Sequence, residues 1–194
     1  MLAKGSFVSE LMRSVIILIL MALVLGLAYP LLMTGVGETF FPKRAAGSLV
    51  YNAQGQVTGS YLIGQSFTAP NEFWGRPSAS GYQPLGSGGS NLGPTNPQLL
   101  KNIQTQIALL EKVNPSQGPI PIDLVTASGS GLDPDISVAA AEYQAQRVAQ
   151  ARHMSLQAVD TLIAQNTQPR AWGVLGEPVV NVLQLNQALD QAAS

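Results

Sequence analysis

The sequence predicts an α+β fold, with one N-terminal transmembrane helix followed by a small sheet packed with several helices. Three observations predict it: an uncharged apolar run near the N-terminus, later segments with helical spacing and capping residues, and short β-prone runs between glycines and prolines. Of the 194 residues, 46% are hydrophobic and only 11% are charged. Soluble domains carry about 25% charged residues, so part of this chain is expected to lie in lipid.

The apolar run extends from Ser14 to Gly37 and lies between the charged residues Arg13 and Glu38. As a helix it would be roughly 36 Å long, enough to cross a hydrocarbon core of about 30 Å. We therefore expect residues 1–13 to be a cytoplasmic N-terminus, residues 14–37 the transmembrane helix, and residues 38–194 an extracytoplasmic domain on the periplasmic side. The orientation follows from the basic residues that precede the helix.

A cleaved signal peptide is the alternative interpretation of this segment. Lys4 and Arg13 precede the apolar run, and Gly26-Leu27-Ala28 has the small-x-small pattern of a cleavage site. The run continues for nine residues after Ala28, past the usual length of the hydrophobic region of a signal peptide, which favours a retained anchor. Pro30 lacks an N–H and would lose the hydrogen bond to Gly26, so a kink is expected in the outer half of the helix.

The first soluble elements are predicted to be a hairpin and a long loop. Gly47–Tyr51 and Gln56–Ile63 are β-prone and are joined by Asn52-Ala53-Gln54-Gly55, where glycine supplies a positive φ. From Ser66 to Pro97 the chain is rich in proline and glycine and shows no long periodic segment. Loops of that length in compact domains are often functional.

Capping residues mark four helices in the remaining chain. Asn96 with Pro97 begins a helix that continues to Val113, and Asn181 with Gln184 resembles a capping box for the last helix. The other two are capped by Ser137, with a helix through Arg152, and by Ser155, with a helix ending near Asn166. Ile122–Val125 and Trp172–Leu175 are predicted to be short strands.

The residues that usually perform catalysis are scarce. Without cysteine the chain has no thiolate nucleophile or thiolate metal site, and a net charge of -1 gives no general attraction to nucleic acid. His153 is the only histidine and is predicted to end a helix. Asp123, Asp133 and Asp135 could bind a divalent cation or act as paired carboxylates, although turn formation before a helix explains them more simply. We expect no catalytic residue and no metal site.

A glycine-rich loop is the clearest candidate binding site. Its residues are Ser87, Gly88, Gly89, Ser90 and Asn91. Successive backbone N–H groups and serine hydroxyls can bind an anion, so the loop could contact a nucleotide or a partner protein. The chain has no Gly-Lys dipeptide, which excludes a Walker A motif, and a tight turn before the Asn96 helix is the structural alternative.

Two adjacent aromatic residues, Phe73 and Trp74, lie in the long loop close to Arg76. If they are exposed, they suit a protein interface, where tryptophan and arginine are enriched. If they are buried, they anchor the loop to the core.

Several unusual strings occur together and in order, and they resemble the C subunit of the bacterial Kdp potassium-transporting ATPase. The strings are Tyr29-Pro30 with Thr34-Gly35, Gly64-Gln65-Ser66-Phe67, Gly75-Arg76-Pro77-Ser78, Ser87-Gly88-Gly89-Ser90-Asn91-Leu92-Gly93, Asp123-Leu124-Val125-Thr126-Ala127-Ser128, Gly131-Leu132-Asp133-Pro134 and Gly176-Glu177-Pro178-Val179-Val180-Asn181-Val182. The resemblance implies a single-pass subunit of the bacterial inner membrane. Its implied partners are a potassium-channel-like subunit, a P-type ATPase subunit and the lipid bilayer, and not nucleic acid.

The resemblance also implies a role in assembly and, as a catalytic chaperone, in raising the affinity of the ATPase subunit for ATP. Ser87-Gly88-Gly89-Ser90 looks like the signature sequence of ATP-binding cassette proteins, with Ser90 in place of glutamine. From the resemblance we expect relatives to have His and Pro more often at the positions of Asp135 and Val138. ATP is used in the cytoplasm, whereas the predicted orientation places the glycine-rich loop outside it. We therefore expect no tightly bound cofactor, and the resemblance leaves ATP as a candidate ligand.

Two other functions compete with the pump subunit. A membrane-tethered extracytoplasmic hydrolase would need His153 as its base, because the chain offers no other histidine. An extracytoplasmic ligand-binding module would need a small molecule that raises its melting temperature.

Overall fold

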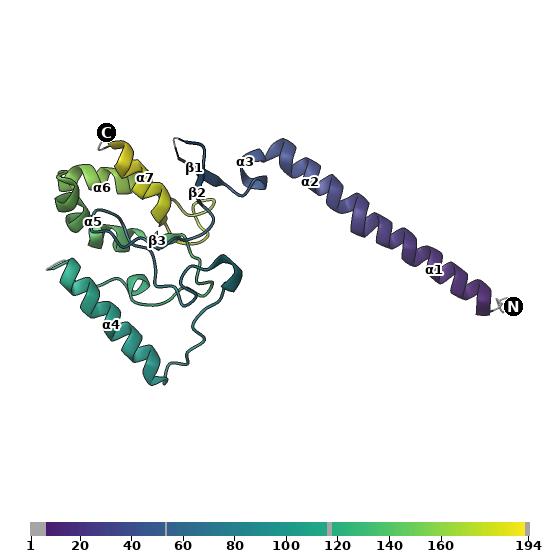
Figure 1. Ribbon diagram of the computed structural model, residues 1–194, viewed down its shortest axis with the longest axis horizontal. Coiled ribbons are helices and arrows are strands. Elements are labelled where there is room, and N and C mark those ends of the chain that lie inside the picture. Colours follow the sequence, from purple (N-terminus) through teal and green to yellow (C-terminus); the bar gives the residue numbers. More distant parts are fainter. Residues whose placement is uncertain (1–6, 53, 116–117, 193–194) are drawn as a thin grey trace. The chain divides into compact units, whose positions relative to one another are not determined.

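The computed structural model describes residues 7–52, 54–115 and 118–192, and the chain divides into two compact units, Met1–Leu49 and Val50–Ser194. The first unit is dominated by one continuous helical segment made of α1 (Phe7–Leu23), a π-helical turn η1 (Val24–Ala28) and α2 (Tyr29–Phe40) (Figure 1). The short helix α3 (Pro42–Ala45) follows.

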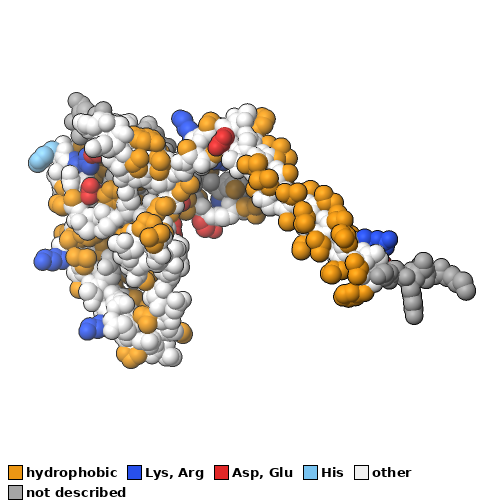
Figure 2. Space-filling view, turned by 45° about the vertical axis from the view of Figure 1, so that its right-hand side comes forward, with side chains coloured by type: hydrophobic (Ala, Val, Ile, Leu, Met, Phe, Trp, Pro, Cys, Tyr) orange, Lys and Arg blue, Asp and Glu red, His pale blue; other side chains and the backbone are white. Residues whose placement is uncertain are grey.

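The helical segment Phe7–Phe40 is long and apolar enough to cross a membrane. It has 34 residues, a mean hydropathy of 2.8 in its most apolar window, and no part of that window is buried. Hydrophobic side chains cover its visible face (Figure 2). At about 1.5 Å per residue the segment is about 51 Å long, so it extends past both ends of the predicted span 14–37.

Pro30 disturbs the helix through a change of hydrogen-bond register. The N–H of Tyr29 donates to the carbonyl of Val24, five residues earlier, in place of the usual partner four residues earlier. Ala28 keeps helical dihedrals, with φ -63° and ψ -47°. The helix therefore passes Pro30 by widening into a single π turn, one of the known ways in which helices accommodate proline.

The predicted hairpin is present at the start of the second unit. β1 (Leu49–Tyr51) pairs with β2 (Val57–Ser60) in a two-stranded sheet. The side-chain Oδ1 of Asn52 accepts the N–H groups of Gln54 at 3.0 Å and Gln56 at 2.9 Å, and Gly55 has φ +75°. Ala53 of the predicted turn lies outside the described residues.

The core of the second unit is built on a three-stranded antiparallel sheet. Its strands are β3 (Asp135–Ser137), β5 (Val179–Asn181) and β4 (Thr167–Gln168), in that spatial order. In the central strand, Val180 lies opposite both Ile136 and Thr167. The sequence did not predict these strands, because segments of two or three residues are too short to show alternation.

Three helices supply most of the remaining core. They are α5 (Val138–Arg152), α6 (Leu156–Gln165) and α7 (Val182–Ala192) (Figure 1). Their buried apolar side chains include Ala140, Ala141, Tyr143, Ala145, Val148, Ala149, Val159, Ile163, Val182, Leu185 and Leu189. By contrast, α4 (Pro97–Val113) buries only Leu110 among its residues. The observed architecture is α+β, as predicted.

All four predicted helix caps are confirmed. The side-chain oxygens of Asn96, Ser137, Ser155 and Asn181 accept backbone N–H groups at 2.9, 3.0, 3.2 and 3.1 Å, each two or three residues later. Such caps stabilise helices by about 1 kcal/mol each.

Both predicted short strands are wrong. Ile122–Val125 contains the 3-10 helix η3 (Ile122–Leu124), which follows Pro121, a residue without an N–H to donate to a strand partner. Trp172–Leu175 belongs to a turn in which Ala171 pairs with Leu175 and Gly173 has φ +77°. The predicted loop over 66–97 is confirmed, apart from the 3-10 turn η2 (Pro84–Gly86).

Candidate functional site

The glycine-rich loop Ser87–Asn91 packs against a second loop at Gly129–Gly131. The N–H of Gly88 donates to the carbonyl of Ser130 at 2.8 Å, and the hydroxyl of Ser87 donates to the same carbonyl at 3.0 Å. A Cβ added to Gly131, which has φ +67°, would lie 2.7 Å from the carbonyl oxygen of Gly88. The close backbone contact explains why glycine is present on both loops.

Within this loop, Ser90 alone among the five candidate residues lines the neighbouring pocket. The pocket has a volume of about 270 Å³ and separates the loop from α4. It is lined by Pro77, Ser78, Ala79, Ser90, Leu99, Asn102, Ile103, Thr105, Gln106, Val125 and Ala127. None of these lining residues carries a charge, so the pocket wall has no cation to neutralise a phosphate group.

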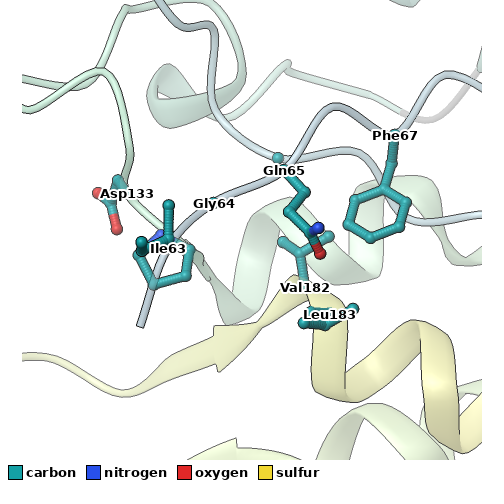
Figure 3. Close-up of a pocket in the computed structure, with 9 residues that line it drawn as sticks. Ile63, Gly64, Gln65, Phe67, Asp133, Val182 and Leu183 are labelled. Atoms are coloured by element: carbon teal, nitrogen blue, oxygen red, sulfur yellow. The ribbon is translucent and has the colours of Figure 1, made fainter. Parts of the chain in front are cut away.

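A second cavity is a packing crevice. It lies where Ile63–Phe67 meets the start of α7 and the Asp133-Pro134 turn, and it leaves no space for a water molecule. Gln65 and Phe67 extend from one segment toward Val182 and Leu183 of α7 (Figure 3). Ligands need larger cavities than this, so we assign the crevice a structural role.

Phe73 and Trp74 anchor the long loop to the core. Phe73 is completely buried. Its N–H donates to Asn186 Oδ1 at 2.7 Å, and its carbonyl accepts from Asn186 Nδ2 at 3.0 Å. Trp74 makes the same pair of hydrogen bonds with Gln144, at 2.9 and 3.1 Å. The buried alternative therefore holds for Phe73, and Trp74 is partly buried and packs against the same core.

Arg147 fixes the preceding part of the same loop. Its Nη1 donates to the carbonyls of Pro70 at 2.5 Å and Glu72 at 3.0 Å, and its Nε donates to Asn114 Oδ1 at 3.0 Å. Burial lowers the pKa of Arg147 to about 10, although the charge of Glu72 opposes the shift. The guanidinium remains charged at neutral pH and satisfies loop carbonyls that would otherwise be buried without donors.

The three aspartates tie loops to strand β3. Asp123 accepts the N–H of Ser137 at 2.8 Å. Asp133 binds Arg76 Nη1 at 2.9 Å and accepts the N–H of Asp135 at 3.1 Å. The Nε of Arg76 is buried and makes no hydrogen bond. Among residues 7–52, 54–115 and 118–192, no group of three or more His, Cys, Asp or Glu side chains could hold a metal ion.

The carboxyl group of Asp135 lies on β3 and is partly buried. Burial raises its pKa and the charge of Asp133 adds to the rise, while the hydrogen bond from Asn181 Nδ2, at 3.0 Å, opposes it. The same amide nitrogen donates to the carbonyl of Tyr61 at 2.9 Å. Asp135 therefore contributes to a polar link between β3, β5 and the segment after β2.

His153 ends α5, as predicted. It adopts the left-handed conformation with φ 56°, and its N–H donates to the carbonyls of Ala149 and Gln150. The side chain is exposed. A general base needs a nucleophile within hydrogen-bond reach, and the hydrogen bonds that the structure gives for His153 are those of its backbone N–H.

The sequence did not identify an exposed apolar tip at Ala171–Leu175. Trp172 is 90% exposed and has φ 52°, and Val174 and Leu175 are 71% and 55% exposed. The tip is nevertheless a defined turn, because the N–H of Ala171 donates to the carbonyl of Leu175 at 2.9 Å and that of Leu175 donates back at 3.0 Å. Arg170 and Glu177 pair at 2.5 Å at its base.

The part of the chain that the structure describes has one candidate membrane-spanning helix and one α+β domain, the architecture of a single-pass, membrane-associated protein. Residues 11–191 match the family model described as KdpC, the c chain of the K+-transporting ATPase. The chain therefore belongs to the KdpC family and is a subunit of a potassium-transporting ATPase complex, as the sequence strings predicted.

Three relatives that share this description cover nearly the whole chain, and each is named as a KdpC subunit of a potassium-transporting ATPase. The relative from Polynucleobacter asymbioticus is 54% identical over 186 residues, which cover 93% of this chain and 98% of the relative. That from Burkholderia ambifaria is 53% identical over 182 residues, covering 92% and 94%. That from Variovorax paradoxus is 51% identical over 185 residues, covering 93% and 95%.

Proposed function

We propose that this chain is a non-catalytic accessory subunit that stabilises the assembled complex of an ATP-driven, high-affinity potassium uptake pump. Its partners in the proposal are a potassium-channel-like subunit and a P-type ATPase subunit. The observation that carries the proposal is the match of residues 11–191 to the KdpC family. The structural roles of Asp123, Asp133 and Arg147 support the non-catalytic part, because the side chains best suited to chemistry instead hold loops in place.

The proposed topology has the N-terminus in the cytoplasm and the α+β domain outside the inner membrane. Lys4 and Arg13 precede the apolar segment and outweigh Glu10, which favours this orientation by the positive-inside rule. Protease added to intact spheroplasts should digest the domain and leave a short membrane-embedded fragment. Survival of the full-length chain until the cells are lysed would contradict the topology.

The exposed tip Ala171–Leu175 is the proposed contact of the domain with the potassium-channel-like subunit. A tryptophan at the centre of a desolvated contact is a typical energetic hot spot. Arg170 and Glu177 form an ion pair at the base of the tip, so together these two side chains carry no net charge to attract an anionic lipid surface. These features favour an apolar recess on a partner protein, rather than the lipid headgroups, as the surface that the tip contacts.

The geometry of the loop Ser87–Asn91 does not favour a direct contact with ATP. Gly88 donates its N–H to Ser130, so one of the donors expected for phosphate is already used. The lining of the adjacent pocket carries no charge. We infer that any rise in ATP affinity of the ATPase subunit arises through assembly of the complex. Isothermal titration of the full-length chain in detergent with millimolar ATP should show no heat of binding, and saturable heat would restore direct contact.

The subunit role is tested by purification from membranes. The full-length chain, tagged at its C-terminus and expressed with the other subunits of its complex, should retain both partners in mild detergent. In cells that do not express the chain, the remaining subunits should be recovered as one assembled complex in lower yield. Purification of the chain alone, with an unchanged yield of the remaining complex in its absence, would contradict the proposal.

A further inference from the structure

The carbonyl of Leu25 has lost both of its ordinary helical donors. In an α-helix it would accept the N–H of Tyr29, but that N–H donates to Val24. At the π-helical spacing it would accept from residue 30, which is proline and has no N–H. The widened turn at Pro30 therefore leaves a backbone acceptor without a donor.

This acceptor lies at the middle of the apolar segment, midway between Arg13 and Glu38. Residues 26–32 contain no Ser, Thr, Asn or Gln side chain that could donate to it. The opposite case occurs almost three turns further along the helix, where the hydroxyl of Thr39 donates to the carbonyl of Gly35 at 2.7 Å. An unsatisfied backbone group in hydrocarbon costs several kcal/mol, so proline in a membrane helix requires compensation.

The helix surface is open to a partner at the same point. Gly26 directly follows Leu25, and a Cβ built on Gly26 would have no atom within 4 Å. None of the residues of α1, η1 or α2 is buried. Small residues let two membrane helices approach closely, and polar side chains then form hydrogen bonds between them.

We propose that the Leu25 carbonyl accepts a hydrogen bond from a Ser, Thr, Asn or Gln side chain on a transmembrane helix of another subunit of the pump. Gly26 is the point of closest approach between the two helices. The occupant is a protein helix because lipid tails have no donor and the centre of the bilayer excludes water. This inference rests on the proposed function and specifies how the anchor recognises its partner.

Two substitutions in the full-length chain test the contact in different ways. Gly26→Leu keeps the disturbed register and adds bulk at the closest approach. Pro30→Ala restores an N–H, so the carbonyls regain donors within the helix and the partner donor becomes unnecessary. Leu31→Ala is the matched control, because it removes a side chain at the same depth and changes no backbone donor. Resistance of each variant to extraction with carbonate confirms membrane insertion.

The measurement is retention of the partner subunits on a resin that binds the tagged chain, over a series of detergent concentrations. We expect both test variants to weaken retention by about 3- to 30-fold, the range for a hydrogen bond between membrane helices, while Leu31→Ala behaves as the original chain. Equal retention by Gly26→Leu, Pro30→Ala and Leu31→Ala would overturn the inference and leave the proposed function intact. Failure of the unchanged chain to retain any partner would overturn both.

Discussion

The guanidinium of Arg147 lies 4.7 Å from the ring centroid of Trp74, so a buried cation on α5 faces an aromatic ring of the long loop. The same guanidinium donates to loop carbonyls and to Asn114 after α4. One side chain therefore joins three regions that are distant in the sequence. The long loop is ordered chiefly by polar contacts with α5 and α7, since few of its own apolar side chains are buried.

Replacement of Arg147 by Met should destabilise the domain strongly. The substitution keeps much of the apolar stem but leaves the carbonyls of Pro70 and Glu72 and the amide oxygen of Asn114 without their donor. We expect a loss of about 3–5 kcal/mol in the free energy of unfolding, measured by denaturant titration of the full-length chain in detergent.

Arg170→Gln is the matched control for that measurement. Arg170 also pairs with an acidic residue, Glu177, but both side chains are largely exposed, at 43% and 75%. Exposed ion pairs contribute about 0–1 kcal/mol, so this variant should unfold almost as the original chain does. If Arg147→Met and Arg170→Gln lowered the free energy of unfolding by similar amounts, the hydrogen bonds of Arg147 to the loop would contribute little to the stability of the domain.

Local features of the domain were predictable from the sequence, whereas its long-range contacts were not. Ser137 and Ser155 reveal helix starts because a cap and its helix are adjacent in the chain. Asn186 pairs with Phe73 across more than a hundred residues, and nothing in its neighbours separates it from a surface amide. Ile122 resembles a strand residue, but the proline before it prevents pairing.

In the candidate site, too, local features were predictable from the sequence and long-range contacts were not. The strings around Gly88 and Gly131 pointed to the family, and both glycines lie where the loops touch. The reason for the glycines is a backbone contact between two segments, which a sequence cannot display. The exposure of Trp172 was not predicted, because a β-prone sequence has the same pattern in a buried strand as in an exposed turn.

Gly131→Ala should disturb the glycine-rich loop. The residue has φ +67°, and its new methyl group would lie 2.5 Å from Ser80 Oγ and 2.7 Å from the carbonyl of Gly88. Neither the positive φ nor the backbone clash can be relieved by a rotamer change, so we expect a loss of about 1–3 kcal/mol. Thermal unfolding of the full-length chain measures it.

Gly129→Ala provides the comparison in the same loop, because a Cβ there meets no atom within 4 Å. It should change the melting temperature little. If Gly131→Ala changed the melting temperature as little as Gly129→Ala, this would contradict the close packing of the two loops.

Asp135 should make stability depend on pH in an unusual direction. Burial raises the pKa of its carboxyl above the model-compound value of 3.8, so the unfolded chain releases this proton at a lower pH than the folded chain does. The ionised carboxyl therefore opposes folding at neutral pH, and that effect disappears as the pH falls through the raised pKa toward 3.8.

Asp135→Asn removes the titration and keeps an oxygen that can accept the hydrogen bond from Asn181. The difference in unfolding free energy between the variant and the original chain should favour the variant at pH 7 and shrink as the pH falls. Asp133→Asn is the contrasting variant, because it breaks an ion pair with Arg76 and should be destabilising at pH 7. A constant difference for Asp135→Asn between pH 7 and pH 4 would contradict the prediction.

Trp172→Ser should weaken assembly of the pump without changing the fold of the domain. The side chain is 90% exposed, so its loss removes almost no internal packing, and serine tolerates the turn at φ 52° no worse than tryptophan does. If the tip enters an apolar recess on a partner, loss of the indole should lower retention of that partner in detergent by about tenfold or more. Ile122→Ser is the control, because Ile122 is also exposed, at 75%, but lies in η3 away from the tip in the sequence. If the Trp172→Ser chain retained its partners as well as the Ile122→Ser chain does, the tip would not be the docking surface. The contact would then have to lie on another exposed apolar segment, such as the hairpin with the side chains of Tyr51 and Val57.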